Sequence, residues 1–147
     1  MTIKEYLSQT FTLNKLINAK KAYILQLHDM HKTISDGICT DENVRTNPSN
    51  NYINDIISQI KSAEDDCHEK IFKMISLQRN IASIIDNIDL PDSRLILFER
   101  YINMKLWEDI AEESHYSLKW VYVLHKRGIT AIEPILKNNT DNDVMSC

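Results

Sequence analysis

Basic side chains without a neighbouring carboxylate mark one stretch near the C-terminal end of the chain. Residues 114–132 contain no aspartate or glutamate. Their basic or titratable side chains are Lys119, Lys126, Arg127, His115 and His125. A solvated helix normally mixes both signs of charge, so an acid-free helix indicates a surface that meets phosphate. The chemistry expected is recognition: cations contact the phosphate backbone, and nearby side chains contact base edges.

The residues just before this stretch carry the opposite charge. Four carboxylates crowd one short helix: Glu108, Asp109, Glu112 and Glu113. We expect this helix to turn away from phosphate, and its acidic side chains are candidates for contact with a protein. Residues 101–136 together hold four Lys/Arg and five Asp/Glu. DNA binding by this segment alone is therefore expected to be weak and strongly salt-dependent.

Apolar residues in the same segment have the spacing of a helix-turn-helix, whose two short helices pack through few side chains. Ala111 and Val121 are ten residues apart, and Leu124 follows three residues later. The small alanine allows a close helix approach, and Ser117 is expected to be the N-cap of the second helix, which would enter the major groove. The alternative is a small helical bundle in which these residues merely pack. Spacing alone does not decide between the two.

Longer helices are expected upstream, because only two glycines and three prolines occur among 147 residues. Apolar residues recur at helical spacing over residues 2–34, with Leu16, Tyr23 and Met30 widening the stripe. A second series recurs every seven residues, at Ile53, Ile60, Cys67, Met74, Ile81 and Ile88, with Ile57, Ile71 and Ile85 between its members. We therefore predict an all-α fold in which residues 1–90 form a long antiparallel coiled-coil hairpin with a loop near 35–50. The hairpin is also expected to form a homo-oligomer.

Pro91 begins a new region, because proline is tolerated in the first turn of a helix but not inside it. Residues 91–137 are expected to form the helix-turn-helix domain, with Leu95, Phe98 and Ile102 on one side of its first helix. Residues 138–147 are polar and are expected to form a flexible tail.

Several functional classes are not supported by the sequence. No catalytic triad order, phosphate-binding glycine loop or zinc-protease motif occurs, so we expect no enzyme, cofactor or small-molecule substrate. His28, His31 and Cys67-His68 could be drawn as a zinc site, but their spacing is not that of zinc ligands, and no metal is expected. The chain lacks an apolar signal core and any run of 18 apolar residues. Cys39, Cys67 and Cys147 are therefore expected to be reduced thiols in a cytoplasmic protein that does not enter a membrane.

The run RYINMKLWEDIAEESHYSLKWVYVLHKR resembles phage and prophage transcription regulators of the RinA and ArpU type, which carry a sigma-70 region 4-like helix-turn-helix. The resemblance is sharp over residues 94–136 and weaker upstream. It implies a phage-encoded, sequence-specific DNA-binding regulator, an activator of late genes, working beside RNA polymerase in the bacterial host cytoplasm. The expected core of the motif is Trp107, Ile110, Ala111, Tyr116, Val121 and Leu124.

The resemblance also implies which side chains meet double-stranded DNA. The residues expected to face the groove are Ser117, Lys119, Trp120, Tyr122, Val123 and Lys126, and Arg127 is expected to reach a phosphate. Trp120 either contacts a base or packs beneath the helix, and the core position is favoured.

The chain departs from the family pattern at several positions. Met104 replaces a turn glycine, which would place Asn103 in the left-handed conformation, and Leu106 replaces a capping threonine. Tyr122-Val123 replaces a His-Arg pair and so removes a cation. Gly128, late in the second helix, would cost about 1 kcal/mol relative to alanine. Together these departures indicate a frayed helix or an altered specificity.

Two other functions remain open at this level. The module could dock on host RNA polymerase or another host protein through the acidic helix without reading DNA. It could also be a structural helical subunit of a larger assembly.

Overall fold

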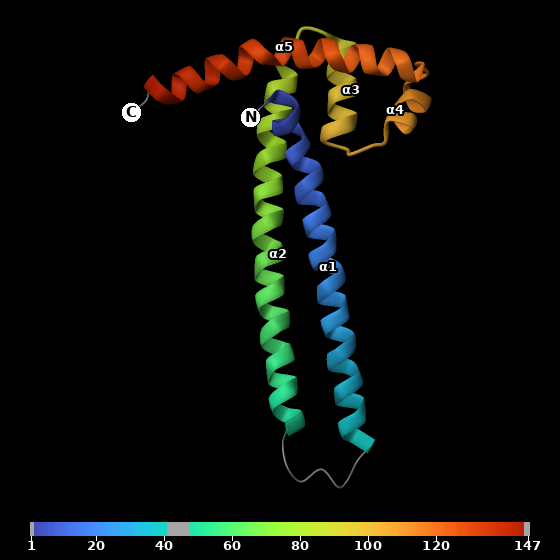
Figure 1. The fold of residues 1–147 in the computed structure, drawn as a ribbon, viewed down its shortest axis with the longest axis vertical. Coiled ribbons are helices and arrows are strands. Elements are labelled where there is room, and N and C mark those ends of the chain that lie inside the picture. Colours follow the sequence, from blue (N-terminus) through green and yellow to red (C-terminus); the bar gives the residue numbers. More distant parts are fainter. Residues whose placement is uncertain (1, 41–47, 146–147) are drawn as a thin grey trace. The chain divides into compact units, whose positions relative to one another are not determined.

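The computed structural model describes residues 2–40 and 48–145, with side chains described over 2–36 and 51–137. Within these residues the chain forms five helices and no strand, which confirms the all-α prediction. The helices are α1 (Ile3–Thr40), α2 (Pro48–Asp86), α3 (Pro91–Tyr101), α4 (Trp107–Ser114) and α5 (Leu118–Met145), as Figure 1 shows.

Three helix ends extend beyond the boundaries expected from sequence. The loop expected near 35–50 is shorter, because α1 continues to Thr40 and α2 begins at Pro48; the remainder, 41–47, lies outside the described residues. The tail expected at 138–147 is also wrong in part, because α5 continues to Met145. No glycine follows Gly128 to end that helix.

The chain divides into two compact units, and the division does not fall at residue 90. One unit is Leu13–Lys73, and the other combines Met1–Thr12 with Met74–Cys147. We call them the hairpin unit and the C-terminal unit. The last part of α2 and the first turns of α1 thus belong to the same unit as α3, α4 and α5.

In the hairpin unit α1 and α2 lie side by side and antiparallel (Figure 1). Leu27 on α1 packs with Ile60 and Ala63 on α2 in one buried cluster. An ion pair also joins the helices, with Lys20 Nζ 3.1 Å from Asp66 Oδ2. This pairing buries a stripe on each helix that neither could bury alone.

Not every residue of the two predicted stripes is buried. Ile60 and Cys67 are buried, but Ile57 is 49% exposed. On α1 the three residues that were expected to widen the stripe are 41–50% exposed: Leu16, Tyr23 and Met30. A pair of helices covers only a narrow seam, so the flanking apolar positions of each helix stay in solvent.

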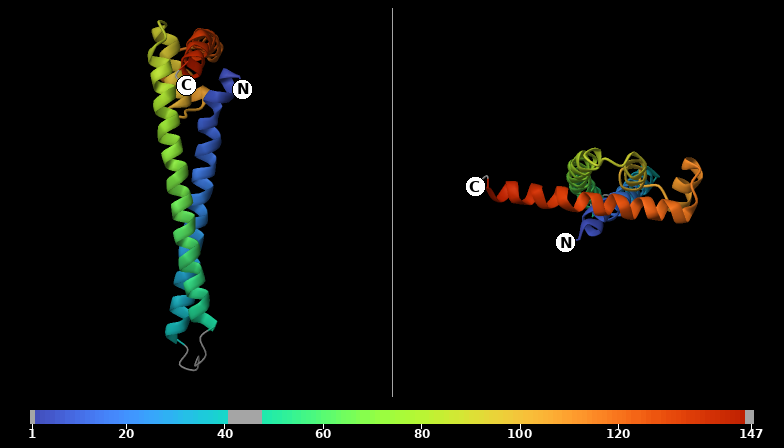
Figure 2. Two further views of the ribbon diagram at one scale, coloured as in Figure 1. Left: turned by 90° about the vertical axis from the view of Figure 1, so that its left-hand side faces the viewer. Right: turned by 90° about the horizontal axis from the view of Figure 1, so that it is seen from above.

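The C-terminal unit has its own larger core. One buried cluster brings together residues of α1, α2, α3, α5 and the α2–α3 connection, namely Leu7, Ile81, Ile84, Ile85, Ile88, Leu97, Tyr101 and Ile132. Figure 2 gives two further views of α5, which is one continuous helix. Its middle part packs on this cluster through Ile129, Ile135 and Leu136.

The buried side of α3 is not the one expected from the sequence. Leu95 and Phe98 are 48% and 36% exposed, whereas Ile96, Leu97 and Tyr101 are buried. The apolar residues of α3 offer two possible faces, and packing against α5 selects the one that includes a serine. Ser93, which is 1% exposed, donates from Oγ to the carbonyl oxygen of Leu124 at 2.8 Å.

Removing the Ser93 hydroxyl is expected to lower the free energy of unfolding by about 1 kcal/mol, the usual net value of a buried hydrogen bond. Chemical denaturation of Ser93→Ala would measure this loss. Ser83→Ala is a matched control on α2, because the Ser83 side chain is exposed. Equal effects of the two substitutions would contradict a role for the bond between α3 and α5.

Candidate nucleic-acid interface

The short helix α4 ends in a tightly bonded turn. His115 has a φ of 60°, in the left-handed region. This conformation directs the next backbone N–H back to the helix, so that Tyr116 N donates to the Ala111 carbonyl at 3.1 Å. Ser114 Oγ adds a bond to the Ile110 carbonyl at 2.6 Å. The direction of the chain after α4 is therefore fixed.

The next helix starts where the sequence predicted. Ser117 precedes α5, and its Oγ accepts a hydrogen bond from the backbone N–H of Trp120 at 3.1 Å. The N-cap prediction is confirmed. Only residues 115–117 separate α4 from α5. At the other end of α4, Leu106 provides no side-chain cap, as its substitution for threonine implied.

The six residues expected to form the motif's core lie in one hydrophobic cluster. Ile110, Val121 and Leu124 are buried in it, and the half-buried members are Trp107, Ala111 and Tyr116. The sequence interpretation missed Ile96 of α3, which is fully buried in the same cluster. The wrong choice of α3 face explains this omission. The cluster locks α3, α4 and the first half of α5 into one body.

Aromatic side chains, His125 and the Arg100 guanidinium cover one edge of this cluster. The Trp107 ring meets Tyr122 at 5.2 Å and His125 at 4.8 Å, both edge-to-face. The Arg100 guanidinium stacks on Trp107 at 4.4 Å and on Phe11 at 4.5 Å. These contacts fix the position of Tyr122 on α5.

His125, one of the basic or titratable side chains of the acid-free stretch, does not carry a positive charge in the fold. Its Nε2 lies 2.7 Å from the Tyr101 hydroxyl. Burial, followed by the charges of Lys4 and Arg100, lowers the pKa of His125 to about 4. Burial also raises the pKa of Tyr101 to about 12, against the opposing effect of Arg100. At neutral pH both groups are uncharged, and the cations of α5 are its lysines and Arg127.

These cations lie on the outward side of α5. Val121, Leu124 and Gly128 face the core, while Lys119 and Lys126, seven residues apart and so on one face, are exposed. Tyr122 is 45% exposed and Val123 is half-buried. Of the expected groove-facing residues, the structure therefore brings Ser117, Lys119, Tyr122, Val123, Lys126 and Arg127 to accessible positions.

Trp120 is not a core residue, contrary to the favoured expectation. It is 38% exposed, and the Arg127 guanidinium lies 5.0 Å from its ring. The two residues are seven apart, so they share one side of α5. The tryptophan holds the arginine in place at the surface. Within the described residues, no ion pair joins Lys119, Lys126 or Arg127 to a carboxylate.

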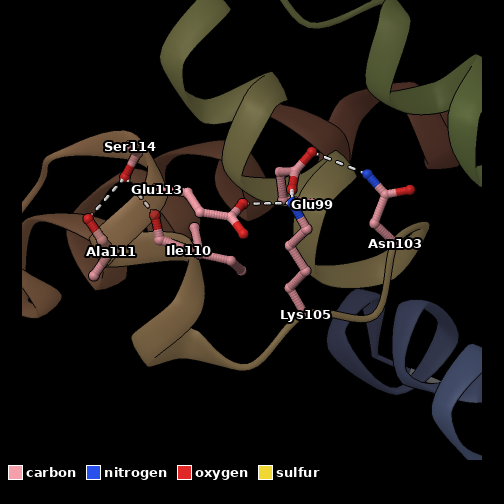
Figure 3. Close-up of polar contacts among 7 residues, drawn as sticks. All are labelled: Glu99, Asn103, Lys105, Ile110, Ala111, Glu113 and Ser114. Atoms are coloured by element: carbon pink, nitrogen blue, oxygen red, sulfur yellow. Dashed lines mark hydrogen bonds and ion pairs between the residues drawn. The ribbon is translucent and has the colours of Figure 1, made fainter.

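The acidic residues of α4 have unequal surroundings. Lys105 lies between Glu113 and Glu99, pairing with Glu113 Oε2 at 2.5 Å and with the Glu99 carboxylate (Figure 3). Hydrogen bonds that Lys105 donates to Glu113 and then to Glu99 raise the pKa of Lys105 to about 12. Glu108, Asp109 and Glu112 are exposed. Of the acidic side chains of α4, Glu113 thus stabilises the α3–α4 connection through Lys105, while α5 carries no carboxylate from Leu118 to Ile132.

The turn between α3 and α4 does not have the expected backbone conformation. Met104 itself takes the left-handed conformation, with φ 56°, and Asn103 does not. Asn103 instead donates from Nδ2 to Glu99 Oε1 at 2.9 Å. Arg100 closes the turn by donating to the Lys105 carbonyl, also at 2.9 Å. These side-chain bonds hold a non-glycine residue in a conformation it rarely adopts.

The residues drawn as a possible zinc site are placed in the hairpin unit without forming a ligand group. His28 Nε2 lies 3.6 Å from Glu64, and Cys67 is a buried free thiol. Nowhere in the described part of the chain do three potential ligands gather. In the same residues, no helix is both long and apolar enough to cross a bilayer.

Comparisons with protein-family models, with curated proteins and with solved structures gave no match to this chain.

Proposed function

We propose that this protein is a sequence-specific DNA-binding transcriptional regulator, in which α4 and α5 form a helix-turn-helix. The observation that carries the proposal is the outward face of α5, where Lys119, Lys126 and Arg127 are exposed on a helix free of carboxylates from Leu118 to Ile132. The helix is held by a short turn and a shared core, as recognition helices are. The three cations suit phosphate, and the side chains between them suit base edges.

The resemblance to phage and prophage late-gene regulators supports a role beside host RNA polymerase. The acid-free part of α5 offers three lysine or arginine side chains, and their number limits the affinity of one module. A second module in the same complex would raise occupancy through effective concentration. Leu16, Tyr23 and Met30 are exposed at intervals of seven along α1, which is the spacing of a coiled-coil seam. A second copy pairing through the long helices is therefore part of the proposal.

A salt titration tests the DNA-binding proposal. A target duplex is first selected from a random-sequence library with the full chain, and affinity is then measured at several salt concentrations. For Lys119→Ala combined with Lys126→Ala, the slope of log affinity against log salt is expected to shrink by about 1.8, since each phosphate contact contributes about 0.9. Affinity at moderate salt is expected to fall about tenfold.

The control is the double variant Lys21→Ala with Lys61→Ala, which removes the same charge from exposed positions on α1 and α2. It is expected to keep the slope of the parent protein. Equal slopes for all three proteins, or no salt-sensitive binding to any duplex, would overturn the proposal.

One observation favours the second candidate, a protein-docking role. Glu108, Asp109 and Glu112 form an exposed acidic surface on α4, apart from the Glu113–Lys105 pair. If this surface binds the polymerase, charge reversal at Glu108 and Glu112 should abolish polymerase binding and leave the DNA salt slope unchanged. Lys119→Ala with Lys126→Ala should instead reduce the DNA salt slope and leave polymerase binding unchanged.

A further inference from the structure

An open groove beside α5 is lined by apolar and basic side chains. It is lined by Leu90, Val123, Lys126, Arg127, Thr130 and Ala131. Val123 lies four residues after Lys119 and three before Lys126, so it falls between the two lysines on the same face. An apolar side chain in the middle of a cationic face has no role in binding phosphate and needs another partner.

The side chains of α5 limit what this face can recognise on DNA. Residues 117–132 contain no Asn, Gln, Asp or Glu. The usual contacts of adenine are made by Asn or Gln, and those of cytosine by Asp or Glu. Serine and threonine contact either of these bases and discriminate poorly between them. The contacts that remain and are specific for one base are Lys or Arg with guanine, and an apolar side chain with the 5-methyl group of thymine.

We propose that Val123 determines sequence specificity by contacting the 5-methyl group of a thymine in the major groove. The inference rests on the proposed DNA-binding function and identifies what that site reads. Lys126 and Arg127, which also line this groove, contact flanking phosphates. Trp120 stacks on Arg127 at 5.0 Å and so holds it in place. Valine suits this contact because its branched side chain has little rotational freedom to lose.

Replacing thymine by uracil tests the proposal on the DNA side. Deoxyuridine removes only the 5-methyl group and leaves the base pair unchanged. In the selected duplex, each thymine is replaced in turn, and the affinity of the full-length protein is measured. One position, or one in each half-site, is expected to lose about fourfold in affinity, the value of burying one methyl group. Thymines outside the protected region serve as controls.

The protein side of the test uses Val123→Ala, with its helical content checked by circular dichroism. This variant is expected to bind the thymine and uracil duplexes equally, so that the fourfold preference disappears. If no single uracil substitution weakens binding, or if Val123→Ala keeps the preference, the inference is wrong while salt-sensitive DNA binding stands. If no duplex is bound at all, the proposed function itself fails.

Discussion

The Gly128→Val variant is expected to have a free energy of unfolding about 3 kcal/mol below that of the parent chain, the upper part of the range for overpacked cores. Gly128 is buried on α5 directly against α3. A Cβ at this position would lie 2.6 Å from Leu97 Cδ1 and 3.1 Å from Leu97 Cγ. Leu97 is itself fully buried. Urea denaturation followed by circular dichroism would measure the loss.

The Gly128→Ala variant separates packing from helix propensity. Alanine in a helix interior is normally worth about 1 kcal/mol over glycine. The collision with Leu97 should outweigh this gain, so we expect a net loss of about 1 kcal/mol in the parent background. In a Leu97→Ala background the obstacle is gone, and the same substitution should become stabilising. Thr130→Ala, at an exposed position on α5, is the control for general effects on the helix.

A stabilising effect of Gly128→Ala in the parent background would show that α3 and α5 do not approach as closely as described. From the sequence alone, Gly128 was expected to have the opposite effect, as a weak point where the helix frays. Propensity describes only the helix itself, whereas the value of this glycine comes from a helix 31 residues earlier in the chain, the separation of Leu97 and Gly128. Long-range proximity of this kind cannot be read from a local pattern.

The core of the α4–α5 pair was predictable because short helices leave few choices. Ile110, Val121 and Leu124 were expected to pack together, and all three are buried in one cluster. Ser117 was equally predictable, because an N-cap depends only on its own turn. These features are local, and local rules suffice for them.

The face of α3 could not be chosen in the same way. Its apolar residues Leu95, Ile96, Leu97 and Phe98 are consecutive, so helical periodicity gives no single stripe. The buried face is selected by partners elsewhere, including the Leu124 carbonyl that accepts from Ser93. The prediction for Trp120 was wrong for a similar reason. A large aromatic residue suggests a core position, and the sequence alone did not show that Arg127 stacks on its ring at the surface.

Acidification from pH 6.5 towards pH 4 is expected to destabilise the protein through His125. The pKa of His125 in the fold is about 4, below the value of about 6.5 in an unfolded chain. Between these values the unfolded state binds the proton and the folded state does not. The contribution of neutral His125 is therefore complete above pH 6.5 and is lost as the pH falls towards 4. One proton corresponds to at most about 1.4 kcal/mol per pH unit. Partial exposure of the ring lowers the expected total to about 2 kcal/mol.

The His125→Gln variant isolates this contribution, because glutamine does not titrate. Carboxylates also begin to titrate in this range, so the informative quantity is the difference in unfolding free energy between parent and variant at each pH. The unfolding free energy of the parent minus that of the variant should decrease steadily from pH 6.5 to pH 4. A His125→Gln profile parallel to that of the parent would contradict this expectation. The ring would then take up its proton near the ordinary pKa in the fold, and α5 would carry one more cation beside Trp107 at mildly acidic pH.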